Sequence, residues 1–125
     1  MQTLLWVMLG SSIGGGARFL LMQVVSSNFG KQLVFGSVCV NIIGSFLASI
    51  LIFSAADKLI TLDDNMRAFL MLGVLGGFTT FSTFSYETVR LLEEGSLVAA
   101  GANILLNVTV CIVAAFVGIS LARQM

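Results

Sequence analysis

The most unusual part of the sequence is residues 76–88, which read GGFTTFSTFSYET inside a strongly apolar region. Six of these residues are Ser or Thr, and Phe78, Phe81 and Phe84 recur at every third position among them. Lipid-facing aromatics account for single Phe residues, but they do not explain why hydroxyl groups fill the gaps. Polar groups at membrane depth are costly and usually mark a function, so this segment is a candidate binding or conducting site.

The same segment is the best candidate for a break in a helix. Adjacent Gly76 and Gly77 lower helix stability, and the chain has no proline that could interrupt a helix elsewhere. Thr79 and Thr80 follow this pair. Backbone carbonyl groups freed at a break need new partners, and at membrane depth they suit a cation, as in the discontinuous helices of transporters.

Asparagine side chains interrupt two other apolar segments. Asn41 lies near the middle of FGSVCVNIIGSF, and Asn103, Asn107 and Cys111 are spaced by four residues, which puts them on one stripe of a helix. Each asparagine must bond either to a neighbouring helix or to something that passes through the protein. The sequence leaves both interpretations open.

The first apolar segment contains GSSIGGGAR, residues 10–18. Glycine and serine at this density favour a tight helix-packing face over a ligand-binding loop. Arg18 is different, because an arginine within a span must reach the interface, pair with a polar group or face water.

The composition of the chain identifies it as a membrane protein. The 125 residues are 58% hydrophobic and 10% charged, whereas a soluble domain carries about 25% charged residues. A spanning helix needs about 20 mostly apolar residues. The apolar stretches therefore predict an all-α membrane protein, a single four-helix domain over residues 1–125. The helices are expected at about 3–25, 33–56, 67–91 and 97–122, joined by SSNFGK, ADKLITLDDN and EEGS.

Several function classes are disfavoured by the same composition. The start Met1-Gln2-Thr3 lacks the positive region of a signal peptide. Net charge is zero with no basic cluster, so no nucleic-acid partner is expected, and the chain has no histidine. Cys39 and Cys111 are interpreted as small apolar fillers rather than as a disulfide or a metal pair. No nucleophile–base pair or metal constellation indicates an enzyme.

The basic residues do not orient the chain. With four spans, one side holds Lys58, Arg67 and Arg123. The other side holds Lys31 and Arg90, or three basic residues if Arg18 reaches it. Cytoplasmic loops usually carry the excess of Lys and Arg, and here there is none. Either translocation partners orient the chain weakly, or it inserts both ways and pairs with an inverted copy. Four helices also enclose too little space for a wide path, which favours a dimer.

At this point the chain resembles a known family, the Fluc (CrcB) fluoride ion channels, over nearly its whole length. The resemblance is carried by GARF at residues 16–19, FGSVCVNIIGSF at 35–46 and GGFTTFSTFSYE at 76–87. It implies an antiparallel, dual-topology homodimer in the inner membrane of a bacterium, with an interrupted third helix and two ion pathways. It also implies a passive channel that exports fluoride from the cytoplasm and so lowers its toxicity.

The resemblance further assigns roles to residues. Phe81 and Phe84 match paired phenylalanines whose ring edges face the anion, and Asn41 matches the pore asparagine. Ser82 and Thr83 match hydroxyls of the pathway. Backbone carbonyls of Gly76 and Thr79 would hold a structural sodium ion at the dimer centre. Four other residues are candidates for the pathway or its support: Arg18, Glu87, Asn107 and Cys111.

The chain departs from the family pattern on the fourth helix. Family members often carry a Tyr or His there, followed by Ser residues, which together form a polar track. The matching positions here are assigned to Asn107, Cys111 and Ala115. Phe78 is an additional aromatic without an assigned role.

Two alternatives belong to other classes. A small dual-topology, proton-coupled multidrug transporter needs a carboxylate within the membrane. The first helix has none, and Glu87 is expected near the end of a span. The chain could also be a packing subunit of a larger complex.

Overall fold

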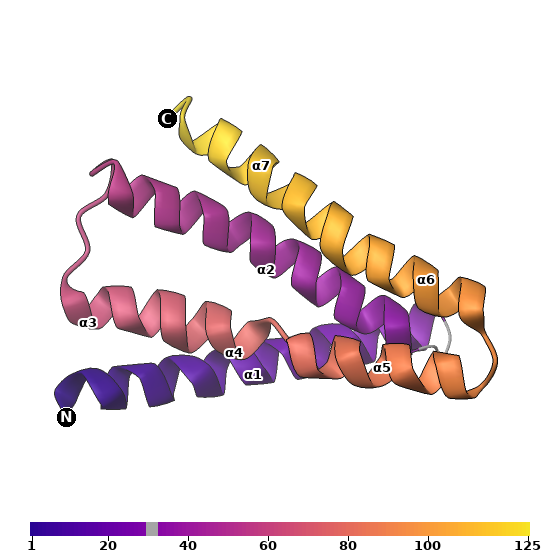
Figure 1. Cartoon of the computed structure of the whole chain (residues 1–125). Coiled ribbons are helices and arrows are strands. Elements are labelled where there is room, and N and C mark those ends of the chain that lie inside the picture. Colours follow the sequence, from indigo (N-terminus) through magenta and orange to yellow (C-terminus); the bar gives the residue numbers. More distant parts are fainter. Residues whose placement is uncertain (30–32) are drawn as a thin grey trace.

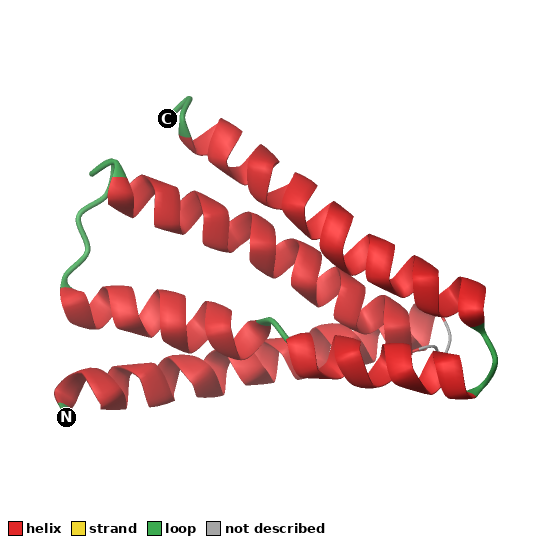
Figure 2. Ribbon diagram, viewed as in Figure 1, coloured by secondary structure: helices red, strands yellow, loops and turns green. Residues whose placement is uncertain are grey.

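The structure is a computed structural model that describes residues 1–29 and 33–125, and within these ranges the chain consists of helices and short connections (Figures 1 and 2). The first span is α1 (Gln2–Phe29) and the second is α2 (Leu33–Ala56). The third span comprises α3 (Asp64–Arg67), the π-helical η1 (Ala68–Leu75), α4 (Gly76–Phe78) and α5 (Phe81–Glu93). The fourth comprises α6 (Leu97–Leu105), the π-helical η2 (Leu106–Val110) and α7 (Cys111–Ala122).

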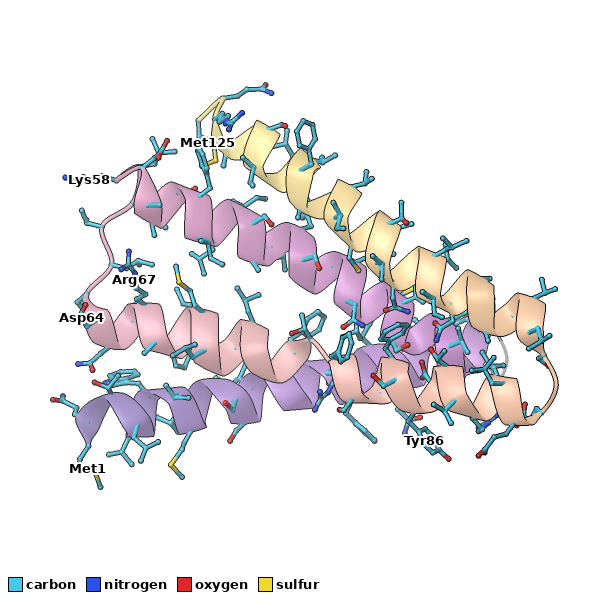
Figure 3. The ribbon with its side chains drawn as sticks, in the orientation of Figure 1. Met1, Lys58, Asp64, Arg67, Tyr86 and Met125 are labelled. Carbon is cyan, nitrogen blue, oxygen red and sulfur yellow. The ribbon has the colours of Figure 1, made fainter. Side chains whose placement is uncertain are left out.

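Four helical spans within the described residues are long and apolar enough to cross a membrane. This confirms the predicted all-helical class. Both termini and the connection between α2 and α3 lie at the same end of the molecule, where Figure 3 labels Lys58, Asp64 and Arg67. The turn between α5 and α6 lies at the opposite end, as an even number of spans requires.

Two helices are longer than the apolar pattern suggested. α1 continues to Phe29 rather than ending near residue 25, because the side chains of Ser27 and Asn28 bond back to the Val24 carbonyl at 2.9 and 2.8 Å. The third span starts at Asp64 rather than 67, and Asp63 caps it by accepting a hydrogen bond from the Met66 N–H at 2.7 Å. Of the predicted connection SSNFGK, residues 30 and 31 lie outside the described residues.

Glycine residues let α1 pack directly on the third span. A Cβ atom on Gly14 would overlap the Val74 carbonyl oxygen, and one on Gly77 would lie 2.8 Å from the Ser11 carbonyl oxygen. Gly10 and Gly73 face each other in the same seam. The glycine-rich sequence of α1 is therefore a packing face, as its composition indicated.

The prediction that the Gly76–Gly77 pair breaks the third helix is wrong in position. Gly76 has helical backbone angles, and α4 runs through both glycines to Phe78. The extended residues are Thr79 (φ −78°, ψ 156°) and Thr80 (φ −150°, ψ 115°), after which α5 begins. Figure 2 shows this connection between α4 and α5. Gly77 is needed for close packing against α1, so a glycine here does not mark the point where the helix stops.

The interior of the chain is built from small and polar side chains. Val40, Asn103 and Ser37 are the largest fully buried residues, whereas large apolar side chains lie mainly on the outside. A membrane protein has no hydrophobic drive to bury leucine, and close packing and internal hydrogen bonds hold its helices together instead.

The seam between α1 and the third span can be tested with two neighbouring glycines. Gly14→Ala places a methyl group against backbone, and we expect it to lower the free energy of unfolding by roughly 1–3 kcal/mol, as overpacking does. In Gly15→Ala the added Cβ has open space within 4 Å, so improved helix propensity should leave stability unchanged or raise it by up to about 1 kcal/mol. Denaturant unfolding in detergent micelles measures both, and equal loss in the two variants would contradict the seam.

Candidate functional site

The two extended residues between α4 and α5 are held by the side chain of Asn41. Its Nδ2 donates to the Thr80 carbonyl at 3.0 Å, and its Oδ1 accepts from the Thr80 N–H at 2.9 Å. The same Nδ2 donates to Asn107 Oδ1 at 2.8 Å. Both hydrogens of the amide are therefore engaged, one by the backbone and one by the fourth span.

Thr80 also starts the next helix. Its Oγ1 accepts from the Thr83 N–H at 3.2 Å, which is an N-cap, and donates to Thr83 Oγ1 at 2.9 Å. Ser82 Oγ lies 3.3 Å from Thr80 Oγ1. The predicted pathway hydroxyls of Ser82 and Thr83 thus gather around Thr80. Tyr86 does not join them, because it is exposed and projects away from α2 (Figure 3).

Arg18 reaches the helix interruption from the other side. Its Nη1 donates to the Thr79 carbonyl at 3.3 Å. Of the three possibilities left open by the sequence, the side chain therefore follows the second and pairs with a polar group, here a backbone carbonyl. It also occupies one of the two carbonyl groups predicted to bind sodium.

The second of those carbonyls belongs to Gly76. In an unbroken helix it would accept from the N–H of Thr80, but that N–H bonds to Asn41. The Gly76 carbonyl is thus without its helical donor. Two carbonyl groups of one chain are too few to enclose a cation.

The aromatic pair stands beside the hydroxyl cluster. The rings of Phe81 and Phe84 meet edge to face, with centroids 5.3 Å apart and an interplanar angle of 64°. Phe84 is 8% exposed, whereas Phe81 is 77% exposed. The ring of Phe84 is therefore buried within the chain, and the ring of Phe81 lies on its surface. Phe78 packs near Gly44.

A cavity of about 430 Å³ lies between α2, the third span and the fourth span, and Arg18, Ser82 and Thr83 are not among the residues that line it. Of the predicted site residues it contains Asn41, Gly76, Thr79, Phe81, Phe84, Asn107 and Cys111. Gly44 shapes its wall, because a Cβ atom there would overlap the Thr79 side-chain methyl group. α2 can approach the extended segment only at a glycine.

Glu87 is deeper in the protein than the sequence suggested. Its side chain is 3% exposed, and Oε2 accepts a hydrogen bond from Ser37 Oγ at 2.5 Å. Oε1 has no partner among the described residues. Glu87 lines a second cavity of about 300 Å³, which also includes Arg90, Glu94 and Asn103.

Ser37 was not selected from the sequence, although a signal was present. Ser37, Asn41 and Ser45 are spaced by four residues and share one face of α2. Ser37 is fully buried against Glu87, and Ser45 lines the larger cavity beside Cys111. The polar stripe on α2 therefore runs from Glu87 to the larger cavity.

The fourth span contributes an asparagine pair. Asn107 Nδ2 donates to Asn103 Oδ1 at 2.9 Å and to the Asn103 carbonyl at 3.1 Å. Asn103 Nδ2 donates to Thr88 Oγ1 at 3.0 Å. Asn103 is completely buried, and it is the second residue of this site that sequence reasoning left out of the predicted set.

Comparison with known proteins decides the family. Residues 5–119 match the family described as CrcB-like protein, Camphor Resistance (CrcB). The chain belongs to the CrcB family. It is 48% identical over 122 residues to the fluoride-specific ion channel FluC of Syntrophotalea carbinolica, covering 98% of both chains. It is 42% identical to FluC of Geobacter sulfurreducens over the full length of both, and 44% identical to FluC of an Anaeromyxobacter species over 98% of this chain and 97% of that one.

Membership of the CrcB family and the four spans together make this chain a multi-pass protein of the bacterial inner membrane. The site described above lies at the centre of the helical bundle rather than at its ends, since Thr79 and Thr80 fall midway along the third span, Asp64–Glu93.

The role of Asn41 in holding Thr80 leads to a stability prediction. Asn41→Asp keeps the side-chain shape but replaces Nδ2 by an oxygen that faces two acceptors, the Thr80 carbonyl and Asn107 Oδ1. We expect the free energy of unfolding to fall by roughly 1–3 kcal/mol, the usual cost of unsatisfied buried polar groups. Ser85→Ala is the control, because Ser85 bonds back to the Phe81 carbonyl of its own helix. Unchanged unfolding of Asn41→Asp would mean that this amide does not hold the extended segment.

Proposed function

We propose that this protein is a fluoride-selective channel that lets fluoride leave the cytoplasm passively. The observation that carries the proposal is the edge contact of Phe81 and Phe84, which line a cavity at membrane depth together with Thr80. The hydroxyls of Ser82 and Thr83 gather on that of Thr80. The names of relatives that align over nearly the whole chain, fluoride-specific ion channel FluC, support the same ion.

The chemistry of the site suits a small, strongly hydrated anion. Such an ion must exchange its water for several hydrogen-bond donors in sequence, and hydroxyl groups supply them without a full charge. A ring edge carries the positive end of the aromatic quadrupole and adds weak attraction. Conduction needs binding that is favourable enough to enter and weak enough to leave. Lys or a desolvated Arg at the narrowest point would hold the ion too tightly.

Asn41 can serve the ion only by exchange. Both of its amide hydrogens are engaged, by the Thr80 carbonyl and by Asn107 Oδ1. An anion at Asn41 would therefore replace one of these acceptors.

A second, inverted copy would complete the pathway. Phe81 is largely exposed, although its partner Phe84 is buried, and the cavity between the spans is open. The basic residues give neither orientation an advantage, which supports insertion both ways. The proposed assembly is an antiparallel, dual-topology homodimer, with membrane lipid around the remaining apolar surface.

The same assembly supports a structural sodium ion at its centre. The Gly76 carbonyl lacks its helical donor, and the Thr79 carbonyl has one lone pair free beside its bond to Arg18. An inverted copy would double these two carbonyls to four, which suits a hard cation. The ion would neutralise backbone dipoles that the interruption leaves exposed at membrane depth.

The decisive experiment is fluoride efflux from liposomes that contain the purified protein. Fluoride should leave down its own gradient, with chloride much slower and with no need for a proton gradient. Phe81→Ile and Phe84→Ile keep bulk but remove the quadrupole. Apolar swaps of similar size cost less than about 1.5 kcal/mol in stability, so dimers matched by size-exclusion profile should persist while flux falls strongly.

Two results would contradict this proposal. Wild-type flux in both isoleucine variants would mean that the rings only pack. Transport of a cationic compound that depends on a proton gradient, without fluoride efflux, would instead favour the proton-coupled transporter, with Glu87 as its embedded carboxylate.

Sodium should stabilise the dimer without being carried through it. Replacing sodium by a large organic cation removes an ion that fits between carbonyl groups, so the melting temperature of the detergent-solubilised dimer should fall. Thr79→Ala keeps the backbone carbonyl and should retain the sodium effect. A melting temperature that is the same in both cations would count against the site.

A further inference from the structure

We propose that Asn103 is a positioning residue, which together with the Thr88 hydroxyl sets the orientation of the Asn107 amide and, through it, of Asn41. The effect on flux rests on the proposed channel function, but the orientation itself does not. The evidence is a chain of side-chain hydrogen bonds that runs from α5 through the fourth span to α2 and ends on the backbone of Thr80.

The chain begins at Thr88, which is buried on α5. A threonine hydroxyl has one hydrogen, and here it goes to the Phe84 carbonyl at 2.8 Å. Towards Asn103, the hydroxyl can therefore only accept. Asn103 Nδ2 donates to this hydroxyl at 3.0 Å, which turns Asn103 Oδ1 towards Asn107, one turn further along the fourth span.

The next two amides follow the same direction. Asn103 Oδ1 requires a donor, and Asn107 supplies Nδ2 at 2.9 Å, while the backbone carbonyl of Asn103 accepts from the same Nδ2 at 3.1 Å. Both acceptors of Asn103 therefore select this orientation of Asn107. Asn107 then presents Oδ1 to α2, where Asn41 Nδ2 donates at 2.8 Å. Asn41 is left with Oδ1 for the Thr80 N–H and its second hydrogen for the Thr80 carbonyl.

The opposite orientation of any one amide would bring like groups together. If Asn103 were reversed, its Oδ1 would face the Thr88 oxygen and its Nδ2 would face Asn107 Nδ2. Because Asn103 is fully buried and Asn107 is 7% exposed, water cannot readily repair such a mismatch. The hydroxyl of Thr88 sets the side chain of Asn103, and the Asn103 side chain and carbonyl together hold Asn107 in the orientation that Asn41 and Thr80 require.

The other explanation is that these asparagines only hold helices together. Both explanations predict a loss of stability when a member is removed. The two explanations differ in what they predict for hydrogen–deuterium exchange at the Thr80 N–H. A pure packing role would not change that exchange relative to the amides of α5.

The test uses two substitutions of Thr88. Thr88→Val replaces the hydroxyl by a methyl group of similar size, whereas Thr88→Ser keeps the hydroxyl and loses the methyl group. Hydrogen–deuterium exchange over residues 79–83 and fluoride efflux per dimer are measured for both in the same liposomes. Val25→Ala, a buried apolar truncation on α1, controls for general loss of packing.

We expect Thr88→Val to speed exchange at residues 79–83 and to reduce efflux by roughly five-fold, the scale of one lost hydrogen bond. Thr88→Ser should remain near wild type in both. Asn103→Leu should resemble Thr88→Val, and the double variant should be no worse than Asn103→Leu alone, because the two residues act through one bond.

Equal behaviour of Thr88→Val and Thr88→Ser, or effects of Thr88→Val and Asn103→Leu that simply add, would overturn the proposal. So would exchange at residues 79–83 that changes no more than in Val25→Ala. If the wild-type protein carried no fluoride, the channel function would fail, and the exchange comparison would still decide the positioning role.

Discussion

The arrangement of the whole site depends on one side chain replacing helical hydrogen bonds. At Thr80 the third span has an N–H and a carbonyl that no helix satisfies, and hydrocarbon supplies no water to pair them. The amide of Asn41 bonds to both, as a peptide group of a neighbouring strand would. Because one planar amide serves both groups, α2 and the extended residues must keep a fixed distance and orientation. Everything that lines the larger cavity is placed relative to that contact.

The glycines make this contact possible from both sides. Gly44 has no Cβ atom that would overlap the side chain of Thr79. α2 therefore comes close enough for the side chain of Asn41 to reach Thr80. On the opposite side, Gly14 and Gly77 bring α1 against α4, and Arg18 reaches the Thr79 carbonyl one turn further along. The interrupted segment is therefore held between two helices, each of which gives up side-chain volume and contributes one long polar side chain. Small residues at interfaces and polar groups as links are the usual means of association in a membrane.

The sequence identified residues that share one cavity, but not how they are arranged. Four apolar stretches were sufficient for the helical class, and the residue patterns together with the family resemblance named seven of the fourteen residues that line the larger cavity. The position of the interruption was wrong, because glycine has two uses: it weakens helices, and it lets them pack closely, and spacing alone does not distinguish these. Glu87 was expected near a span end from its place in the sequence, whereas the bond from Ser37 depends on how α2 and α5 cross. Hydrogen-bond directions among Asn41, Asn103 and Asn107 require three helices in place, and no single-helix pattern contains them.

The same contact that holds Thr80 also limits how an ion can use the site. Asn41 has no spare hydrogen, so each hydrogen bond it gives to an anion is taken from the Thr80 carbonyl or from Asn107. Loss of the Thr80 carbonyl bond frees an acceptor in a segment that already contains the Gly76 carbonyl without its helical donor, and a bound cation could compensate for it. Loss of the Asn107 bond leaves Thr80 held but exposes an oxygen to the approaching anion, which is repulsive. Loss of the Thr80 carbonyl bond also leaves an oxygen beside the anion, so in the proposed channel exchange on that side would depend on the carbonyl groups being neutralised by the proposed sodium ion. A site arranged in this way would bind an anion only transiently, since the native acceptors compete to return.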